Sequence, residues 1–523
     1  MKMPRTLRWI GLVCVAAAAG CAEPVDSPKH LVLIVVDTLR ADAVGCYGGD
    51  AETPNIDRLA AEGVRFDQAR SHIPITGPSH LSLFTSLPPN QHGVHNNAQV
   101  VPDDAEPLAE LLSESGFGTT GIVSLGVLDS KFGFSRGFDI FDDQILDRYW
   151  RDAAEVNEVV LPLLDAKTRM RRFFWIHYSD PHSPYAAPDA DLPAADVFLD
   201  NAFVAQVRLD GRGFSIPVAL PPGETVLEFR PGRDDTSRRV ILRRYRFQGS
   251  DARIEVRGGR DLGATRLTGT VIYGRTPVGV ALVNPSDDVI TGEFEGKIEF
   301  TPERKALPRF YRDEVEFVDR QIGRLIDKLR SVGIWEDSLV VFIADHGEGL
   351  GFSGRFAHVE HLYEDTLRVP LILVSPGRMA PGTVVTSSVR LIDVLPTMME
   401  VLGLTPPRGI SGESLVPLIN GSGPDRPLVA MTYGPQAKHD RRALVADGFK
   451  YIWTIEGDGR ELFDLASDPG ELINLVDEDP SRADTMHERL LRGLAETDSD
   501  GFAPPVDLSE DEKEALEALG YVH

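Results

Sequence analysis

Short, continuous apolar runs mark the strands expected at the centre of this chain. Such runs are typical of strands buried on both faces of a parallel sheet. They cover Leu31–Val36, Phe173–Tyr178, Leu339–Ala344 and Leu371–Ser375, with a further strand expected at Thr119–Leu125 and helices at Leu108–Ser115 and Val315–Leu329. Strands that alternate with amphipathic helices predict an α/β fold, with a mostly parallel central sheet flanked by helices.

Two regions depart from this rhythm. Residues 191–303 contain short alternating segments separated by Gly, Pro and Asp turns, which predicts an inserted all-β, sandwich-like module. Residues 443–465 read as three antiparallel strands with tight turns, followed by a polar linker and a small helix at about 508–519. We therefore divide the chain into a signal peptide (1–20), a tether (21–30), an α/β core (31–190 plus 304–425), the β module (191–303) and a small C-terminal antiparallel subdomain with a helical tail (426–523).

The first twenty residues have the pattern of an export signal. Lys2, Arg5 and Arg8 precede the apolar stretch Trp9–Ala19, which is shorter than the roughly 20 residues that span a bilayer. The following Ala-Gly-Cys21 resembles the lipobox of bacterial lipoproteins, whose cysteine is acylated. We expect an exported protein of the bacterial cell envelope, anchored to a membrane by lipid on Cys21; a plain secreted protein is the alternative.

Charge and cysteine content narrow the choice of partners. The 523 residues carry a formal charge of −26, and loss of the three positive residues of the signal would make it −29. Such an acidic surface argues against a nucleic-acid partner. Cys14 lies in the signal and Cys21 in the lipobox, which leaves only Cys46 and no intramolecular disulfide framework.

Candidate chemistry follows the strand ends. Asp37, His182 and the pair Asp345-His346 each lie at or just beyond the carboxyl end of an expected strand, where ligands bind in open α/β sheets. Carboxylate oxygens and imidazoles are ligands for divalent cations. Each acidic site could instead be a helix or strand cap.

Thr76 is the candidate nucleophile. It lies in the turn Ile75-Thr76-Gly77-Pro78-Ser79-His80, just before a helix-like run. Backbone N–H groups at a helix N-terminus favour an anion. The same residue types are also common in loops and at helix N-caps that have no catalytic role.

With these sites in place, the sequence resembles the sulfatase family of the alkaline phosphatase superfamily. The resemblance covers about 31–190 and 304–523 and is carried by ordered blocks: VVDTLRADAVGCYGG, TPNIDRLAAEGVRF, the Thr76 turn with HGV, HYSDPHSPY, IADHGEGLG, LYEDTLRVPLIL, ELFDLASDPGELINL and the closing ALGYV. It implies one divalent metal ion, calcium by analogy with sulfatases or zinc or manganese by analogy with the phosphatase branches. It also implies an anionic substrate, a sulfated or phosphorylated small molecule, glycan or lipid.

The resemblance assigns roles residue by residue. It implies Asp37, Asp345, His346 and Thr76 as metal ligands; Thr76, His182, His80 and His358 as catalytic residues; and Lys131 and His361 as substrate-binding residues. His358 is preferred to His361 as the acid or cation near the substrate, although either could be a surface histidine.

Three departures from the family pattern bear on function. The sulfatase nucleophile is a Cys or Ser oxidised to formylglycine, whereas Thr76 cannot become that aldehyde. His80 replaces the motif's arginine, and Lys131 is the only candidate cation where the family has Gly-Lys-Trp-His. We therefore expect a hydrolase of phosphate mono- or diesters or of phosphonates, or a related transferase. The alternatives are sulfate-ester hydrolysis without formylglycine, and a catalytically decayed, lipid-anchored protein that binds a glycan or protein.

Overall fold

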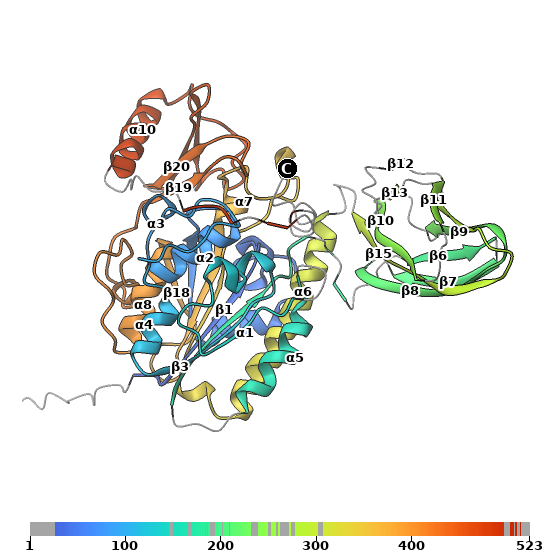
Figure 1. Ribbon diagram of the computed structural model, residues 1–523. Coiled ribbons are helices and arrows are strands. Elements are labelled where there is room, and N and C mark those ends of the chain that lie inside the picture. The colour runs from blue at the N-terminus through green and yellow to red at the C-terminus, as the bar shows by residue number, and fades with distance from the viewer. Residues whose placement is uncertain are drawn as a thin grey trace, which may run out of the picture.

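The computed structural model divides the chain into an α/β core, two sheets beside it and a small C-terminal sheet (Figure 1). It describes residues 27–145, 150–165, 170–183, 185, 187–188, 194–200, 202–208, 210–231, 239–248, 253–257, 260–261, 271–273, 278–301, 307–495, 503–506, 508–509 and 513. Cys21 and most of the expected helix at 508–519 lie outside these residues. Within the described part of the chain, no helix is both long and apolar enough to cross a membrane.

The core is an eight-stranded sheet. Its strand order is β18-β2-β17-β16-β1-β5-β3-β4, and only β17 runs against the others. The strands are β1 (His30–Val36), β2 (Val64–Arg70), β3 (Phe117–Ile122), β4 (Ile140–Asp142), β5 (Arg171–Tyr178), β16 (Ser338–Ala344), β17 (Arg368–Val374) and β18 (Thr383–Arg390). Every residue of β16 is buried, and so is every residue of β1 except His30, as expected of central strands covered on both faces.

Helices cover the sheet. Figure 1 shows α5 and α6 side by side along one face, with α2, α4 and α8 toward the other. The core helices are α1 (Pro54–Glu62), α2 (Thr76–Thr85), α3 (Pro89–His92), α4 (Leu108–Glu114), α5 (Ala153–Leu164), α6 (Leu307–Ser331), α7 (Glu364–Leu367), α8 (Val394–Val401) and α9 (Val416–Ile419). The predicted fold class, a mostly parallel α/β sheet with helices, is confirmed.

Residues 194–301 contribute two antiparallel five-stranded sheets, ordered β12-β13-β10-β15-β8 and β11-β14-β9-β6-β7. Phe214 and Phe294 of the first sheet and Phe229 of the second meet with ring centroids 5.7–6.2 Å apart, so apolar side chains fill the space between the sheets. The strands are β6 (Ala194–Leu199), β7 (Ala202–Arg208), β8 (Asp210–Leu220), β9 (Gly223–Pro231), β10 (Arg239–Gln248), β11 (Arg253–Arg257), β12 (Arg260–Asp261), β13 (Val271–Tyr273), β14 (Val278–Asn284) and β15 (Ile290–Thr301). The domain boundaries remain predictions.

The C-terminal sheet has four antiparallel strands, β19 (Leu428–Thr432), β20 (Arg441–Ala446), β21 (Phe449–Thr454) and β22 (Gly459–Asp464). It is followed by α10 (Pro480–Ala495), a helix in the stretch that the sequence analysis assigned to a polar linker. That assignment was wrong because Ala483, Met486 and Leu490 form a narrow apolar stripe that packs against the sheet, while the rest of the helix is polar.

A buried ionic network joins this sheet to the core. The fully buried Lys450 of β21 lies 2.8 Å from Glu364 and 2.9 Å from Glu471. Arg70, at the end of β2, lies 2.8 Å from the same Glu364. Breaking one partner of such a network leaves a buried charge uncompensated, so we expect it to fix the C-terminal sheet against the core.

Candidate functional site

The site lies at the carboxyl edge of the central sheet. Asp37 follows β1 directly, and Asp345 and His346 follow β16, its parallel neighbour. The pairing of Val36 with Ala344 puts the two strand ends level, so the next residues of both strands face one another. All three side chains are fully buried, and their ligand atoms lie within 4.8 Å of one another.

The two carboxylates lack internal compensation. Asp37 Oδ1 and Asp345 Oδ2 have no hydrogen-bond partner among the described residues; each instead lies within 3.7 Å of His346 Nε2. Burial raises the pKa of Asp37 well above its usual range, and the neighbouring Asp345 adds to this. Burial also raises the pKa of Asp345 to about 6. Unpartnered buried carboxylates of this kind are the groups that a bound cation satisfies.

The orientation of His346 fits the same purpose. Its Nδ1 lies 2.9 Å from the carbonyl oxygen of Gly347, which can only accept a hydrogen bond. Nδ1 therefore carries the proton, and Nε2 presents a lone pair toward the two carboxylates. Burial lowers the pKa of His346 to about 3, so the ring is neutral at physiological pH. These three residues fit a divalent metal ion.

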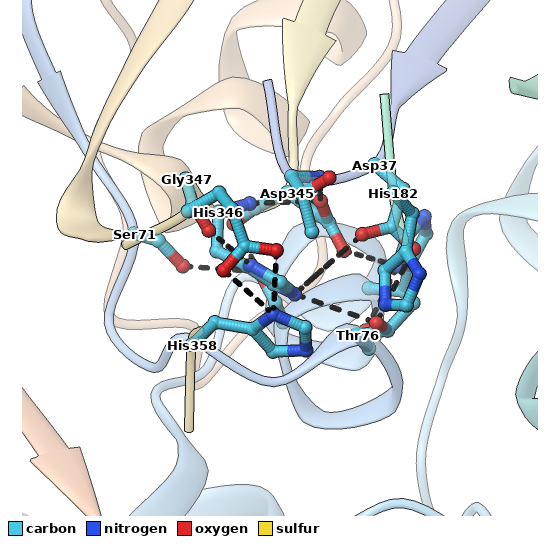
Figure 2. A network of polar contacts seen from close by, with 12 residues as sticks. Asp37, Ser71, Thr76, His182, Asp345, His346, Gly347 and His358 are labelled. Carbon is cyan, nitrogen blue, oxygen red and sulfur yellow. Dashed lines mark hydrogen bonds and ion pairs between the residues drawn. The ribbon is translucent and has the colours of Figure 1, made fainter. Parts of the chain in front are cut away.

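Thr76 completes the group. It is the first residue of α2, and its Oγ1 lies 3.3 Å from Asp37 Oδ2 and 3.4 Å from His346 Nε2 (Figure 2). Its side chain is fully buried. The predicted helix therefore begins at the candidate nucleophile itself, and the hydroxyl lies beside the cation ligands.

Thr76 lies at a helix N-terminus as predicted, but the next three positions provide no free backbone N–H group. Gly77 N donates to Asn97 Oδ1 at 2.8 Å, Pro78 has no N–H, and Ser79 N donates to Ile75 O at 3.0 Å. Asn97 thus accepts the hydrogen bond of the N–H group beside the nucleophile. At these positions the helix end attracts an anion through its dipole and not through free N–H donors.

Two buried histidines flank the carboxylates. His80 Nδ1 lies 2.8 Å from the carbonyl of Thr76 and 3.6 Å from Asp345 Oδ2. His177 Nε2, from β5, lies 3.8 Å from Asp37 Oδ2, and its Nδ1 lies 2.8 Å from Ser124 Oγ. Burial lowers the pKa of both rings, so neither supplies the fixed positive charge of the family's arginine.

A third group of side chains lies beside the site and consists of His182, Tyr185, Glu348 and His358. The His358 ring centroid lies 4.7 Å from that of His346 and 5.2 Å from that of His182, which follows β5. His358 Nδ1 lies 3.3 Å from Glu348 Oε2, and Tyr185 OH donates to the same oxygen at 3.1 Å. Burial raises the pKa of Glu348 and lowers the pKa of His182 to about 3 and of His358 to about 4.

The two predicted substrate-binding residues, Lys131 and His361, contact aromatic side chains. Lys131 is half-buried in a short 3₁₀ turn (Ser130–Phe132), with its Nζ 4.8 Å from the Phe132 ring centroid. His361 is buried, not a surface histidine, and its ring lies 6.0 Å from that of Tyr363. His358 and His361 were the two candidates for the acid or cation near the substrate, and His358 is the one that lies beside His346.

Sequence reasoning missed Glu348, His177 and Asn97. Glu348 lies two residues beyond His346, in the same glycine-rich block, and an acidic residue there was a usable signal. His177 lies inside an apolar strand, where the sequence gives no sign that its ring points to the metal ligands. Asn97 is brought to Gly77 only by tertiary packing.

Comparison with known proteins agrees with this arrangement. A family model described as Sulfatase matches residues 29–404, and a second, the C-terminal region of N-sulphoglucosamine sulphohydrolase, matches residues 352–499. The chain is 34% identical over 457 residues to the choline-sulfatase of Rhizobium meliloti, which covers 86% of this chain and 82% of that protein.

Solved structures show the same fold. One protein, in complex with its substrate D-glucosamine-2-N,6-O-disulfate, has a TM-score of 0.62 at 18% identity and covers 91% of this chain and 99% of its own. The phosphonate monoester hydrolase of Agrobacterium radiobacter has a TM-score of 0.60 at 18% identity and covers 90% and 96%. Homologues of this kind are ester hydrolases, and the family match over most of the chain shows that this protein belongs to the sulfatase family.

Proposed function

We propose that the chain is a metal-dependent hydrolase that attacks phosphate esters, phosphodiesters or phosphonates with Thr76. The observation that carries this proposal is the position of Thr76 Oγ1, 3.3 Å from Asp37 Oδ2 and 3.4 Å from His346 Nε2. A hydroxyl buried between two cation ligands, at the first residue of a helix, is positioned as an activated nucleophile.

The chemistry of threonine favours phosphorus over sulfur. A formylglycine hydrate releases sulfate by reforming its aldehyde, a route that Thr76 lacks. Thr76 Oγ1 can form a bond to phosphorus as the alcohol leaves, and water can then hydrolyse the phosphothreonine to restore the hydroxyl. The hydroxyl proton points to Asp37 Oδ2 and must leave before Oγ1 attacks.

Asp37, Asp345, His346 and Thr76 would hold the metal, which when bound polarises the ester and lowers the pKa of the nucleophile. Resemblance to sulfatases implies calcium. However, calcium takes oxygen ligands, and an imidazole nitrogen in the donor set suits zinc or manganese better. All three ions therefore belong in the first assay.

The leaving oxygen needs a proton. His182 and His358 lie with their ring centroids 5.2 Å apart, and His358 is 4.7 Å from the His346 ring. Glu348 lies beside His358 Nδ1, and the carbonyl of Ser183 accepts from His182 Nδ1, so a proton for the leaving oxygen must be held at Nε2 of a ring that has become imidazolium. We propose that one of these two rings takes up that second proton from solvent and then serves as the general acid.

Sulfate-ester hydrolysis is the second candidate. Family membership and the 34% identity to a choline-sulfatase favour it. It would require Thr76 to release sulfate by a step other than formylglycine collapse, and a substrate panel separates the two candidates directly.

The test is turnover of aryl phosphate, phosphodiester, phosphonate and aryl sulfate by the full chain, with EDTA and with calcium, manganese or zinc. Thr76→Ala is compared with Thr85→Ala, a matched control that removes a buried hydroxyl from the same helix. We expect phosphorus-ester turnover that Thr76→Ala reduces at least a thousandfold, on the order of nucleophile deletions, and that Thr85→Ala leaves within a fewfold. Sulfate turnover alone would overturn the phosphoester proposal. No turnover with any metal would favour a decayed, ligand-binding protein.

We also propose export and lipid anchoring through Cys21, supported by the charged and apolar segments before it. Detergent partitioning of the expressed protein, compared with Cys21→Ser, tests this. Recovery of the wild-type protein in the aqueous phase would contradict it.

A further inference from the structure

A second cavity lies where the core meets the C-terminal sheet, apart from the Thr76 site. It measures about 440 Å³ and is bordered by the ends of β2 and β18, by β19 and β20, and by α10. Figure 1 shows α10 beside the C-terminal sheet that contains β19 and β20. None of the proposed metal ligands or catalytic residues lines this cavity.

The cavity is cationic in an acidic protein. Arg390, Arg489 and Arg492 line it, and no Asp or Glu is among its described lining residues. The whole chain carries a formal charge of −26, whereas the described lining of this cavity contains three arginines and no carboxylate. A concave surface of one charge concentrates ligands of the other.

The three arginines differ in how far they are already neutralised. Arg390 lies 2.8 Å from Asp393, and Arg489 pairs with Asp447, outside this cavity. Arg492 is exposed and forms no ion pair with a described residue. Positions 489 and 492 are three apart on one helix and therefore lie on the same face. Arg492 is thus the guanidinium available for a ligand, with the other two adding positive potential.

The cavity also contains a buried neutral acceptor. His72 is 3% exposed, and its Nδ1 lies 2.8 Å from the carbonyl of Val429, so Nδ1 carries the proton. Its Nε2 has no hydrogen-bond partner among the described residues. Burial, with Arg390 nearby, lowers the pKa of His72 to about 4, which keeps the ring neutral. A ligand whose anionic group contacts Arg492 and whose hydroxyl group donates to His72 Nε2 would bind both residues.

A neighbouring cavity provides a contrast. It measures about 340 Å³ and shares Arg489, but Asp425 and Asp447 also line it. Its arginines therefore face carboxylates within the same hollow, and it offers an anion less than the 440 Å³ cavity does.

The cavity is close to the nucleophile along the chain. His72 precedes Thr76 by four residues, and four residues of extended chain span at most about 14 Å. The backbone positions of His72 and Thr76 are therefore at most about 14 Å apart, and the titrations below test whether one substrate engages both sites.

We propose that this cavity is a second binding site for an oxyanion, a sulfate or phosphate group that bears or neighbours a hydroxyl. The group comes either from a free inorganic anion or from a second anionic substituent of an extended substrate. The site stands independently of which ester Thr76 attacks.

The first arm of the test is isothermal titration of the full chain with inorganic phosphate and with sulfate, at low ionic strength in EDTA. Without metal, the two buried carboxylates repel an anion from the Thr76 site, so binding reports the arginine cavity. Arg492→Glu is compared with Arg482→Glu, an exposed arginine of the same helix that pairs with Asp479 at 2.9 Å. Both side chains are exposed, so both variants should keep the wild-type Tm.

We expect Arg492→Glu to weaken oxyanion binding at least about fivefold, as for loss of a charge-assisted contact, and Arg482→Glu to change it less than twofold. Equal effects of the two variants would show non-specific charge attraction and overturn the proposal. Absence of binding to the wild-type protein would overturn it as well.

The second arm separates the two sources. The metal-loaded chain with Thr76→Ala is titrated with a disulfated disaccharide and with inorganic sulfate, each with and without Arg492→Glu. Tighter disaccharide binding that Arg492→Glu removes would support a substrate-borne group; equal loss of both would support a free anion. Disaccharide and sulfate binding that Arg492→Glu leaves unchanged would overturn the site, whatever ester Thr76 attacks.

Discussion

Replacing Asp345 with Asn is expected to stabilise the metal-free protein and to abolish its stabilisation by metal. Asp345 is fully buried, and its Oδ2 faces His346 Nε2 at 3.5 Å and His80 Nδ1 at 3.6 Å, two rings whose pKa burial lowers. Above its pKa the carboxylate is therefore an uncompensated buried charge, which Asn removes at nearly constant volume.

The magnitude follows from the pKa. Burial raises the pKa of Asp345 from 3.8 to about 6, and this difference corresponds to about 3 kcal/mol at pH 8. Because the folded-state pKa lies above the unfolded one, the cost is absent below pH 3.8, grows between pH 4 and 6, and is complete above pH 6. Stability of the metal-free protein should therefore fall with rising pH across this window, and in the Asn variant this fall should be smaller by the Asp345 contribution, while that of Asp37 remains.

The substitution keeps the backbone contacts of the site. Oδ1 of Asp345 accepts from the backbone N–H groups of His346 at 2.8 Å and of Thr38 at 3.3 Å, and the Asn carbonyl can accept both. The Asn amide can donate to the Nε2 lone pair of His346, so no new buried group is left unpaired. Metal at a thousand times its Kd adds about 4 kcal/mol to the wild-type protein, and the variant, lacking a charged ligand, should gain far less.

The assay is urea unfolding at pH 5 and pH 8, in EDTA and with saturating metal. Asp393→Asn is the matched control, because that carboxylate is equally buried but lies 2.8 Å from Arg390 and 3.2 Å from Arg426. The control should destabilise the protein by about 3 kcal/mol at both pH values, as for a broken buried ion pair. If Asp345→Asn is less stable than wild type in EDTA at pH 8, or gains equally from metal, the reasoning is refuted.

Three further predictions follow from the contacts described above. Lys450→Met should cost about 3–5 kcal/mol in urea unfolding, because the buried Glu471 loses its nearest cation and Glu364 keeps only Arg70; an unchanged midpoint would contradict the network. Glu348→Gln should lower kcat on esters with poor leaving groups about tenfold or more and spare activated aryl esters, if it orients His358; equal loss on both would indicate a merely structural role. His177→Phe should weaken metal binding about 10–100-fold, measured by titration calorimetry, because it removes the imidazole nitrogen beside Asp37; unchanged affinity would show that His177 does not affect the metal ligands.

The candidate site was predictable because of one property of parallel sheets. Apolar runs identify central strands, and the polar residues that follow them must meet at the carboxyl edge. Asp37 and Asp345 were therefore placed together from sequence, and the structure brings Thr76 and His346 to the same point.

The direction of a strand and the orientation of a side chain were not predictable in the same way. The run at Leu371–Ser375 reads like the parallel strands, yet β17 is antiparallel, because only the tertiary path of the chain sets its direction. His177 occupies an apolar strand and Asn97 a loop, and both reach the site only through packing. The narrow apolar stripe of α10 was too weak a signal in a polar stretch to predict a helix.

The two ligand sites of this protein differ in how their charge is balanced. Two other buried acids of the described chain have internal cations, Asp393 with two arginines and Glu364 with Arg70 and Lys450. Asp37 and Asp345 have no ion pair with a described Arg or Lys, and burial lowers the pKa of the imidazole that faces both. The Thr76 site therefore requires an external cation before it can attract an anionic ester, whereas the arginine cavity attracts an anion with its own side chains. A substrate with two anionic groups would engage the arginine cavity even in EDTA and the Thr76 site only when metal is supplied.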